Sequence, residues 1–164
     1  MSDMLVKLYS LPPLAPVLTA LAKANIEIRP GDPSEKSVIA KWVRHHFDES
    51  WAIGCEVGLG QRPITCYVAV EKALPPDAPQ NAYDQPAQLL VGMACYDVAS
   101  RGMFGPTGVR ADYRGRGIGT GLLLACLHAM AAERYAYAII GWAGVPDFYA
   151  RTVGATLIPD SEPG

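Results

Sequence analysis

The sequence predicts a single α/β domain in which short strands and helices alternate along the chain. A length of 164 residues suits one domain with a substantial core. Half of the residues are hydrophobic and 18% are charged, as in an ordinary globular protein. Apolar stretches with the two-residue period of strands are separated by stretches with helical spacing.

The predicted strands lie at residues 5–9, 26–29, 63–71, 88–98, 104–109, 137–141 and 155–158. The predicted helices lie at residues 14–24, 32–47, 122–130 and 146–153. The second helix has the clearest start, because Asp32 can cap it and Pro33 suits its first turn. Four prolines within residues 74–86 predict an exposed loop between two strands.

Glycines alternate with other residues in the stretch 109–121, immediately before an almost uncharged helix. Such a loop exposes main-chain N–H groups at a helix N-terminus, where a partial positive charge favours anions and above all phosphates. Two arginines add positive charge beside it. Gly121, one turn further on, either extends this site or lets the helix pack closely. The residues expected to contact phosphate are Arg114, Gly115, Arg116, Gly117, Ile118, Gly119 and Thr120.

The glycine spacing excludes two common nucleotide motifs. A dinucleotide fingerprint needs a glycine where Thr120 stands, and a P-loop needs a Gly-Lys pair that the chain lacks. The spacing Arg-x-x-Gly-x-Gly at Arg114, Gly117 and Gly119 instead resembles the GCN5-related N-acetyltransferase (GNAT) family. This resemblance implies that main-chain amides of the loop bind the pyrophosphate of acetyl-coenzyme A.

The resemblance covers roughly residues 26–158 and implies a fold. It predicts a GNAT-like domain over residues 26–164, with a central, mixed, mostly antiparallel sheet flanked by helices. Residues 1–25 are then an N-terminal extension, a strand and a helix that pair onto the sheet edge or cover it. The resemblance also places Thr107, Gly108 and Val109 beside the coenzyme, with a main-chain N–H near Val109 polarising the thioester carbonyl.

A second resemblance lies near the C-terminus, where Phe-Tyr-Ala-Arg at residues 148–151 is similar to the family's Phe-Tyr-x-Lys signature. It implies that Tyr149 is catalytic and protonates the leaving thiolate, a task that suits a phenol. The alternative is that Tyr149 only packs its helix against the sheet. Two positions depart from the family pattern: Gly154 follows the tyrosine one residue late, and Trp142 replaces an asparagine that the family often carries.

The general base is not assigned by the sequence. Many relatives use a glutamate on or near the strand that precedes the glycine loop, and here that strand contains no acid. Asp97, Glu71, His45 and His46 are the open alternatives. His128 lies inside an apolar helix, which favours a packing or capping role.

Composition limits the partners. A net charge of −2 provides no general basic field, so we expect no nucleic-acid partner. The N-terminus has no basic run and no apolar segment is long enough to span a bilayer, so we expect no membrane association. The four cysteines show no metal-binding spacing, which favours buried, reduced thiols in a cytoplasmic protein and no metal. Because family members often dimerise, a homodimer is an open alternative.

The leading functional hypothesis is an N-acetyltransferase that transfers an acetyl group from acetyl-coenzyme A to the primary amine of a small molecule. The transfer would occur by direct attack in a ternary complex. A non-catalytic acyl-coenzyme A-binding or sensing domain is the first alternative, motivated by the missing acid and by Trp142. An acetyltransferase acting on a protein lysine or N-terminus is the second.

Overall fold

The computed structural model describes residues 1–72 and 89–162, so the loop predicted at 74–86 lies outside the described residues. The strands are β1 (Met4–Lys7), β2 (Ile26–Pro30), β3 (Cys66–Glu71), β4 (Leu89–Tyr96), β5 (Met103–Val109), β6 (Tyr137–Ile140) and β7 (Thr156–Leu157). The helices are α1 (Ala15–Lys23), α2 (Lys36–His46), α3 (Glu49–Gly60), α4 (Ile118–Ala132) and α5 (Pro146–Val153). All predicted strands and helices are present, with shifted ends, and α3 is an additional helix.

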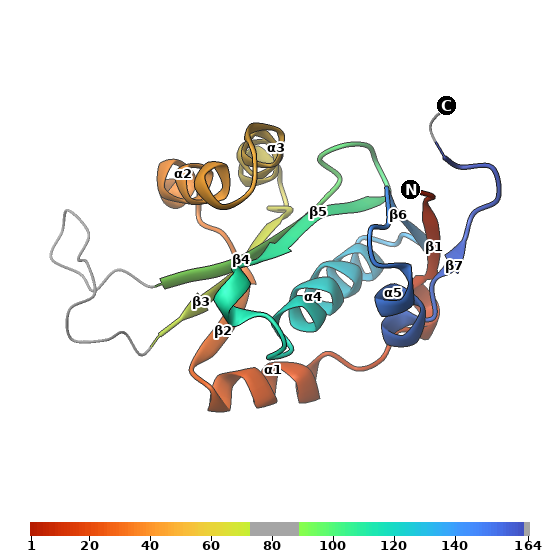
Figure 1. The fold of residues 1–164 in the computed structure, drawn as a ribbon, viewed down its shortest axis with the longest axis horizontal. Coiled ribbons are helices and arrows are strands. Elements are labelled where there is room, and N and C mark those ends of the chain that lie inside the picture. The colour runs from red at the N-terminus through yellow and green to blue at the C-terminus, as the bar shows by residue number, and fades with distance from the viewer. Residues whose placement is uncertain (73–88, 163–164) are drawn as a thin grey trace, which may run out of the picture.

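Within the described residues the strands form one sheet in the order β2-β3-β4-β5-β6-β1-β7. Neighbouring strands are antiparallel except β5 and β6, which are parallel. Helices α2 and α3 cover one face of the sheet, and α1 and α4 cover the other (Figure 1). The predicted α/β class with a mixed, mostly antiparallel sheet is confirmed.

The strand in the predicted N-terminal extension lies inside the sheet, not at its edge. β1 pairs with β6 along Met4–Lys7 and with β7 through Met4 and Leu5. Met4 and Val6 are fully buried in the larger apolar cluster, which also contains most of α4. Residues 1–25 therefore contribute to the same core as the remainder of the chain.

Helix α3 shows why the sequence pattern did not predict it. Asp48 caps it by accepting the Trp51 N–H at 2.9 Å, but the interior contains Gly54 and Gly58, which are poor helix formers. At Gly58 a Cβ atom would lie 3.0 Å from the main-chain nitrogen of Cys66 on β3. The glycine is needed because helix and strand approach so closely.

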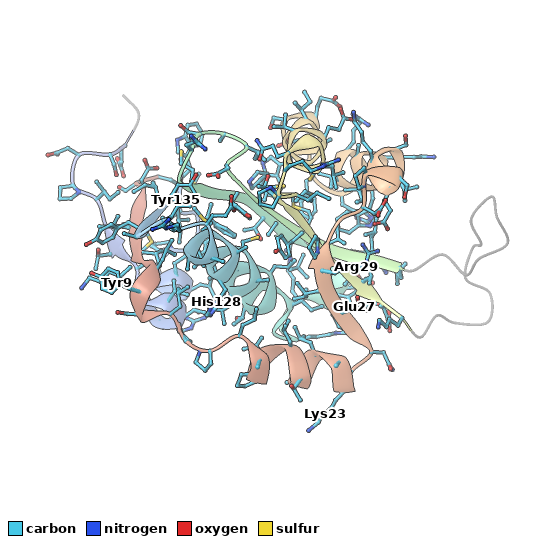
Figure 2. All side chains as sticks on the ribbon, turned by 180° about the vertical axis from the view of Figure 1, so that it is seen from behind. Tyr9, Lys23, Glu27, Arg29, His128 and Tyr135 are labelled. Atoms are coloured by element: carbon cyan, nitrogen blue, oxygen red, sulfur yellow. The ribbon has the colours of Figure 1, made fainter. Side chains whose placement is uncertain are left out.

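Helix α4 is fixed on its outer side as well as against the sheet. His128 Nε2 donates to the Pro12 carbonyl oxygen at 2.7 Å, which ties α4 to the segment before α1 (Figure 2). At Gly121 a Cβ would lie 2.4 Å from Ile28 Cδ1 and 2.7 Å from Leu21 Cδ1. Gly121 therefore allows α4 to pack closely against its neighbours, and His128 bonds α4 to the segment before α1.

The Gly121→Leu variant is expected to lose about 1–3 kcal/mol of unfolding free energy, because overpacking this contact outweighs the better helix propensity of leucine. Gly60→Leu is the matched control, since a Cβ there would meet nothing within 4 Å. Urea denaturation of both variants measures the difference. Equal stability of the two variants would contradict the close-packing interpretation.

Candidate functional site

The glycine loop presents an uninterrupted run of free main-chain donors. Gly115 and Gly117 have φ of 78° and 84°, in the left-handed region, and Gly117 is the N-cap of α4. The first bond of the helix runs from the Gly121 N–H to the Gly117 carbonyl. Within the described residues, the six N–H groups from Gly115 to Thr120 donate to no protein acceptor. A Cβ at either positive-φ glycine would meet nothing within 4 Å, so the space above these donors is open.

The side chains of both arginines in the loop bond to main-chain carbonyls. Arg114 Nε donates to the Val109 carbonyl at 3.1 Å, and Arg116 donates to the Asp112 carbonyl at 3.2 Å. The Arg116 guanidinium also lies 4.4 Å from the centre of the Tyr113 ring. Neither Arg114 nor Arg116 is ion-paired with a carboxylate in the described part of the chain. Their charge is available to an anion at the helix N-terminus.

Strand β5 leads from this loop along an open edge of the sheet. β6 pairs with β5 only at Met103 and Phe104, because β6 ends at Ile140. The Arg110 N–H donates to the Val91 carbonyl on β4. Because main-chain groups of successive residues in an antiparallel strand point to alternate sides, those of Val109 and Thr107 point away from β4, toward this open edge. An extended chain lying there could bond to both residues. Gly108 instead faces the rings of Phe47 and Trp51.

A cavity of about 810 Å³ opens where β5 and β6 separate. One wall comes from α3, with Trp51, Ile53 and Val57. The opposite wall comes from the segment after β6 and from α5, with Trp142 and Tyr149. The α3 residues are the part of this site that the sequence analysis missed. The signal that could have found them is the cap sequence Asp-Glu-Ser at residues 48–50, which marks a helix start.

Tyr149 is 6% exposed and lines this cavity. Within the described residues its hydroxyl has no hydrogen-bond partner, and no side-chain N or O atom is both fully buried and unpaired. The hydroxyl is therefore accessible, on a residue that lines the cavity. Burial raises the pKa of Tyr149 above its ordinary value, which keeps the phenol protonated and able to donate.

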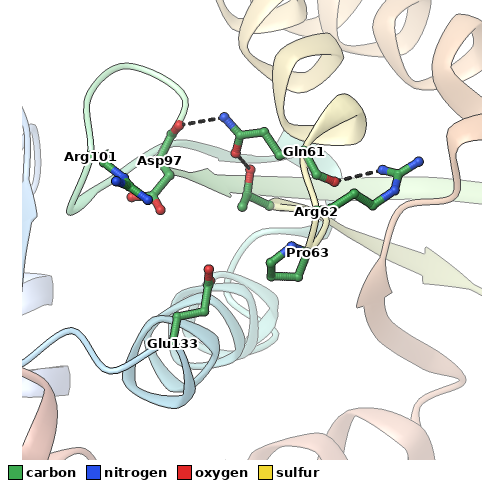
Figure 3. A pocket seen from close by; sticks show the side chains of 7 residues that line it. Gln61, Arg62, Pro63, Asp97, Arg101 and Glu133 are labelled. Atoms are coloured by element: carbon green, nitrogen blue, oxygen red, sulfur yellow. Dashed lines mark hydrogen bonds between the residues drawn. The ribbon is translucent and has the colours of Figure 1, made fainter.

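None of the four candidate bases lines the cavity. The Asp97 carboxylate accepts the Gly102 N–H at 2.7 Å and the Tyr135 hydroxyl at 2.8 Å, which fixes the turn between β4 and β5. Asp97 also lines a separate polar pocket of about 280 Å³, where Gln61 donates to its carbonyl at 3.0 Å (Figure 3). Glu71 accepts the Tyr113 hydroxyl beside the glycine loop.

The two adjacent histidines pack together at the end of α2. The ring centre of His46 lies 4.9 Å from that of His45 and 4.8 Å from that of Trp42. Burial lowers the pKa of His46, and the neighbouring His45 adds to this effect. Neither ring lies on the cavity wall, so the structure brings neither histidine to Tyr149.

All four cysteines are free and buried. The sulfur atoms of Cys55, Cys66 and Cys95 lie within 4.8 Å of one another, between α3 and the sheet. Soft metal ions bind such groups of thiolates, and the linear spacing of the cysteines does not reveal this cluster. Hydrogen bonding to Cys55 and Cys66, together with burial, raises the pKa of Cys95, whereas hydrogen bonds from Cys66 and Cys95 lower the pKa of Cys55.

Comparisons with known proteins agree with this geometry. The family model described as "Acetyltransferase (GNAT) family" matches residues 43–154, more than half of the chain. No curated protein matches the chain. A helix long and apolar enough to cross a bilayer does not occur in the described residues.

Several solved structures share the fold. A GCN5-related glucosamine N-acetyltransferase region of a fungal multi-domain GH3 β-N-acetylglucosaminidase superposes with a TM-score of 0.71 and 17% identity, covering 96% of this chain and 19% of that one. A GCN5-related N-acetyltransferase from Sphaerobacter thermophilus superposes with a TM-score of 0.63 and 20% identity, covering 96% of this chain and 48% of that one. A GCN5-related N-acetyltransferase-like protein from Streptococcus suis superposes with a TM-score of 0.57 and 12% identity, covering 96% of this chain and 58% of that one. The chain thus spans from about a fifth to somewhat over half of these proteins. These structures share the fold of the chain, and the family match over more than half of its length shows that the chain belongs to the GNAT acetyltransferase family.

Proposed function

We propose that this protein transfers an acetyl group from acetyl-coenzyme A to the primary amine of a small molecule, in a ternary complex. The observation that carries the proposal is the run of six free N–H groups from Gly115 to Thr120, which leads into an open strand edge and then into a cavity with a phenol. An acyl carrier with a pyrophosphate at one end and a thioester at the other fits this order of chemical groups.

Each part of the site has a proposed task. The loop amides, with Arg114 and Arg116, bind the pyrophosphate, and the main chain of Thr107 binds the arm that lies along β5. The Val109 N–H is the proposed donor to the thioester carbonyl, in the manner of an oxyanion hole. As the carbon–sulfur bond breaks, Tyr149 donates its proton to the sulfur.

The alternatives predict different measurements. A sensing domain binds the coenzyme and releases no thiol with any amine. A protein acetyltransferase needs acidic groups to bind a basic peptide, and the cavity wall carries none. The fungal relative is described as acting on glucosamine, which makes an amino sugar a further small-molecule candidate. The homodimer stays a prediction that light scattering can test.

The test is isothermal titration with acetyl-coenzyme A, followed by thiol release with a panel of amines. Micromolar binding and amine-dependent thiol release are expected. Binding without release for every amine would favour the sensing domain, and the absence of binding would refute the assignment of the glycine loop.

A further inference from the structure

The cavity beside Tyr149 is lined mainly by apolar side chains. None of the side chains that line it belongs to Asp, Glu, His, Lys or Arg. The polar side chains other than the Trp indoles are Ser50, Thr107 and Tyr149, and the Thr107 hydroxyl already donates to the Met93 carbonyl at 3.2 Å. Among the lining residues, the titratable side chain is the phenol of Tyr149.

Large apolar side chains also surround the mouth of this cavity. Nine such side chains are exposed in the described part of the chain, and five of them line the cavity. These five are Met1, Ile53, Val57, Trp142 and Val145. Clustered exposed apolar residues at a cavity of ligand size mark a binding site better than scattered ones do.

Trp142 occupies a strained position at this mouth. Its φ of 49° lies in the left-handed region, which is uncommon and unfavourable for a bulky residue. The Asp3 carboxylate holds this backbone by accepting the Trp142 N–H at 2.9 Å. The indole is nevertheless 63% exposed. The strained backbone therefore places a large aromatic side chain at the cavity and not in the core.

We infer that the acceptor is a lipophilic primary amine, of the arylalkylamine type, which enters this cavity uncharged. This inference rests on the proposed function and narrows its substrate class. A cationic amine would lose hydration here without gaining a carboxylate partner, and a sugar would bury hydroxyls that find few partners. An aromatic ring, in contrast, gains contact with Trp51, Ile53 and Trp142.

The proton balance follows from this entry of the neutral form. The ammonium ion loses one proton to solvent before it binds, so no carboxylate base is needed. The nitrogen of the neutral amine forms a bond to the acetyl carbon, and the carbon–sulfur bond breaks. Tyr149 supplies the proton that the sulfur takes up, and the second proton lost by the nitrogen returns to the Tyr149 oxygen through water. The products are one amide and one free thiol.

The first experiment compares phenethylamine, glucosamine and spermidine as acceptors by thiol release. We expect kcat/KM for phenethylamine to exceed both others at least tenfold. Faster turnover of glucosamine or spermidine would overturn the inference and leave the acetyltransferase proposal intact. If acetyl-coenzyme A does not bind, or if it binds and no amine releases thiol, the proposed function fails, and the inferred acceptor class fails with it.

A charge placed on the cavity wall tests the same inference. Ile53→Glu should lower the phenethylamine-to-spermidine ratio of kcat/KM about tenfold or more, while the Kd of acetyl-coenzyme A stays within twofold. Val38→Glu is the matched control, because Val38 is an exposed apolar residue on α2 that does not line the cavity. If the Ile53 variant misfolds by circular dichroism, Val57→Glu, one turn further along α3, replaces it. An unchanged ratio would overturn the inference.

The pH dependence of kcat/KM tests the entry of the neutral amine separately from the fit of the acceptor in the cavity. With ring-substituted benzylamines of different pKa, log kcat/KM should rise with pH until the pKa of each free amine. The inflection should therefore shift with the acceptor. One fixed inflection for all acceptors would assign the proton to a group of the protein and would overturn the entry of the neutral amine.

Discussion

The Gly117→Glu variant is expected to bind acetyl-coenzyme A at least about a hundredfold more weakly than the parent protein. The glutamate would add a negative charge at the N-cap of α4, beside six N–H groups that have no protein acceptor. Losing two charge-assisted hydrogen bonds, each of about 1.5–3 kcal/mol, is sufficient for this effect, since about 1.4 kcal/mol corresponds to a factor of ten. Isothermal titration measures the change.

Gly117→Gln separates charge from backbone strain. Both substitutions place a side chain of similar size at a φ of 84°, and a Cβ there meets nothing within 4 Å, so both should fold. The glutamine variant should retain clearly more affinity than the glutamate variant. Affinity of the glutamate variant within threefold of the parent, with an unchanged circular dichroism spectrum, would refute phosphate binding at this loop.

The glycine loop could be predicted from the sequence because its geometry is decided locally. Gly115 and Gly117 adopt the left-handed conformation that glycine tolerates best, and the uncharged stretch that follows can only be a buried helix. The family resemblance rests on the same few residues. Most strands and the helix at Pro146–Val153 were equally accessible, because each carries its own period and boundary residues.

The position of β1 could not be predicted, because it depends on pairing between distant segments. Met4 pairs with Ile140 and Leu157, and nothing near residue 4 indicates either partner. Helix α3 was hidden for a different reason. Gly54 and Gly58 weaken its helical pattern, and the close approach that requires Gly58 becomes visible only once β3 is in place beside the helix.

The residues that line the cavity could also not be predicted from the sequence. The candidate bases Asp97, Glu71, His45 and His46 lie outside the cavity, whose walls come from α3 and from the segment after β6. Asp97 illustrates the limit: a single acid near a strand end suggests chemistry, and its actual partners, Gly102 and Tyr135, show a turn that it stabilises. β5 carries no acid, and the mainly apolar walls of the cavity give that absence a chemical meaning.

The Tyr149→Phe variant is expected to lower kcat on the order of ten- to a thousandfold, with an unchanged Kd for acetyl-coenzyme A. The phenol is the proposed proton donor to the leaving sulfur. Its hydroxyl has no partner in the described residues, so its removal leaves no unpaired group, and phenylalanine fills the same space. Stability should therefore stay within about 0.5 kcal/mol of the parent.

The Tyr96→Phe variant is a control that separates a catalytic role of a tyrosine hydroxyl from a structural one. Tyr96 is also buried, but its hydroxyl donates to Glu133, away from the cavity, so the loss of that bond should reduce stability and leave kcat unchanged. The two tyrosines thus predict opposite results in steady-state kinetics and in urea denaturation. If Tyr149→Phe instead loses stability at an unchanged kcat, the phenol only packs α5 against the sheet, and the sulfur must take its proton from solvent.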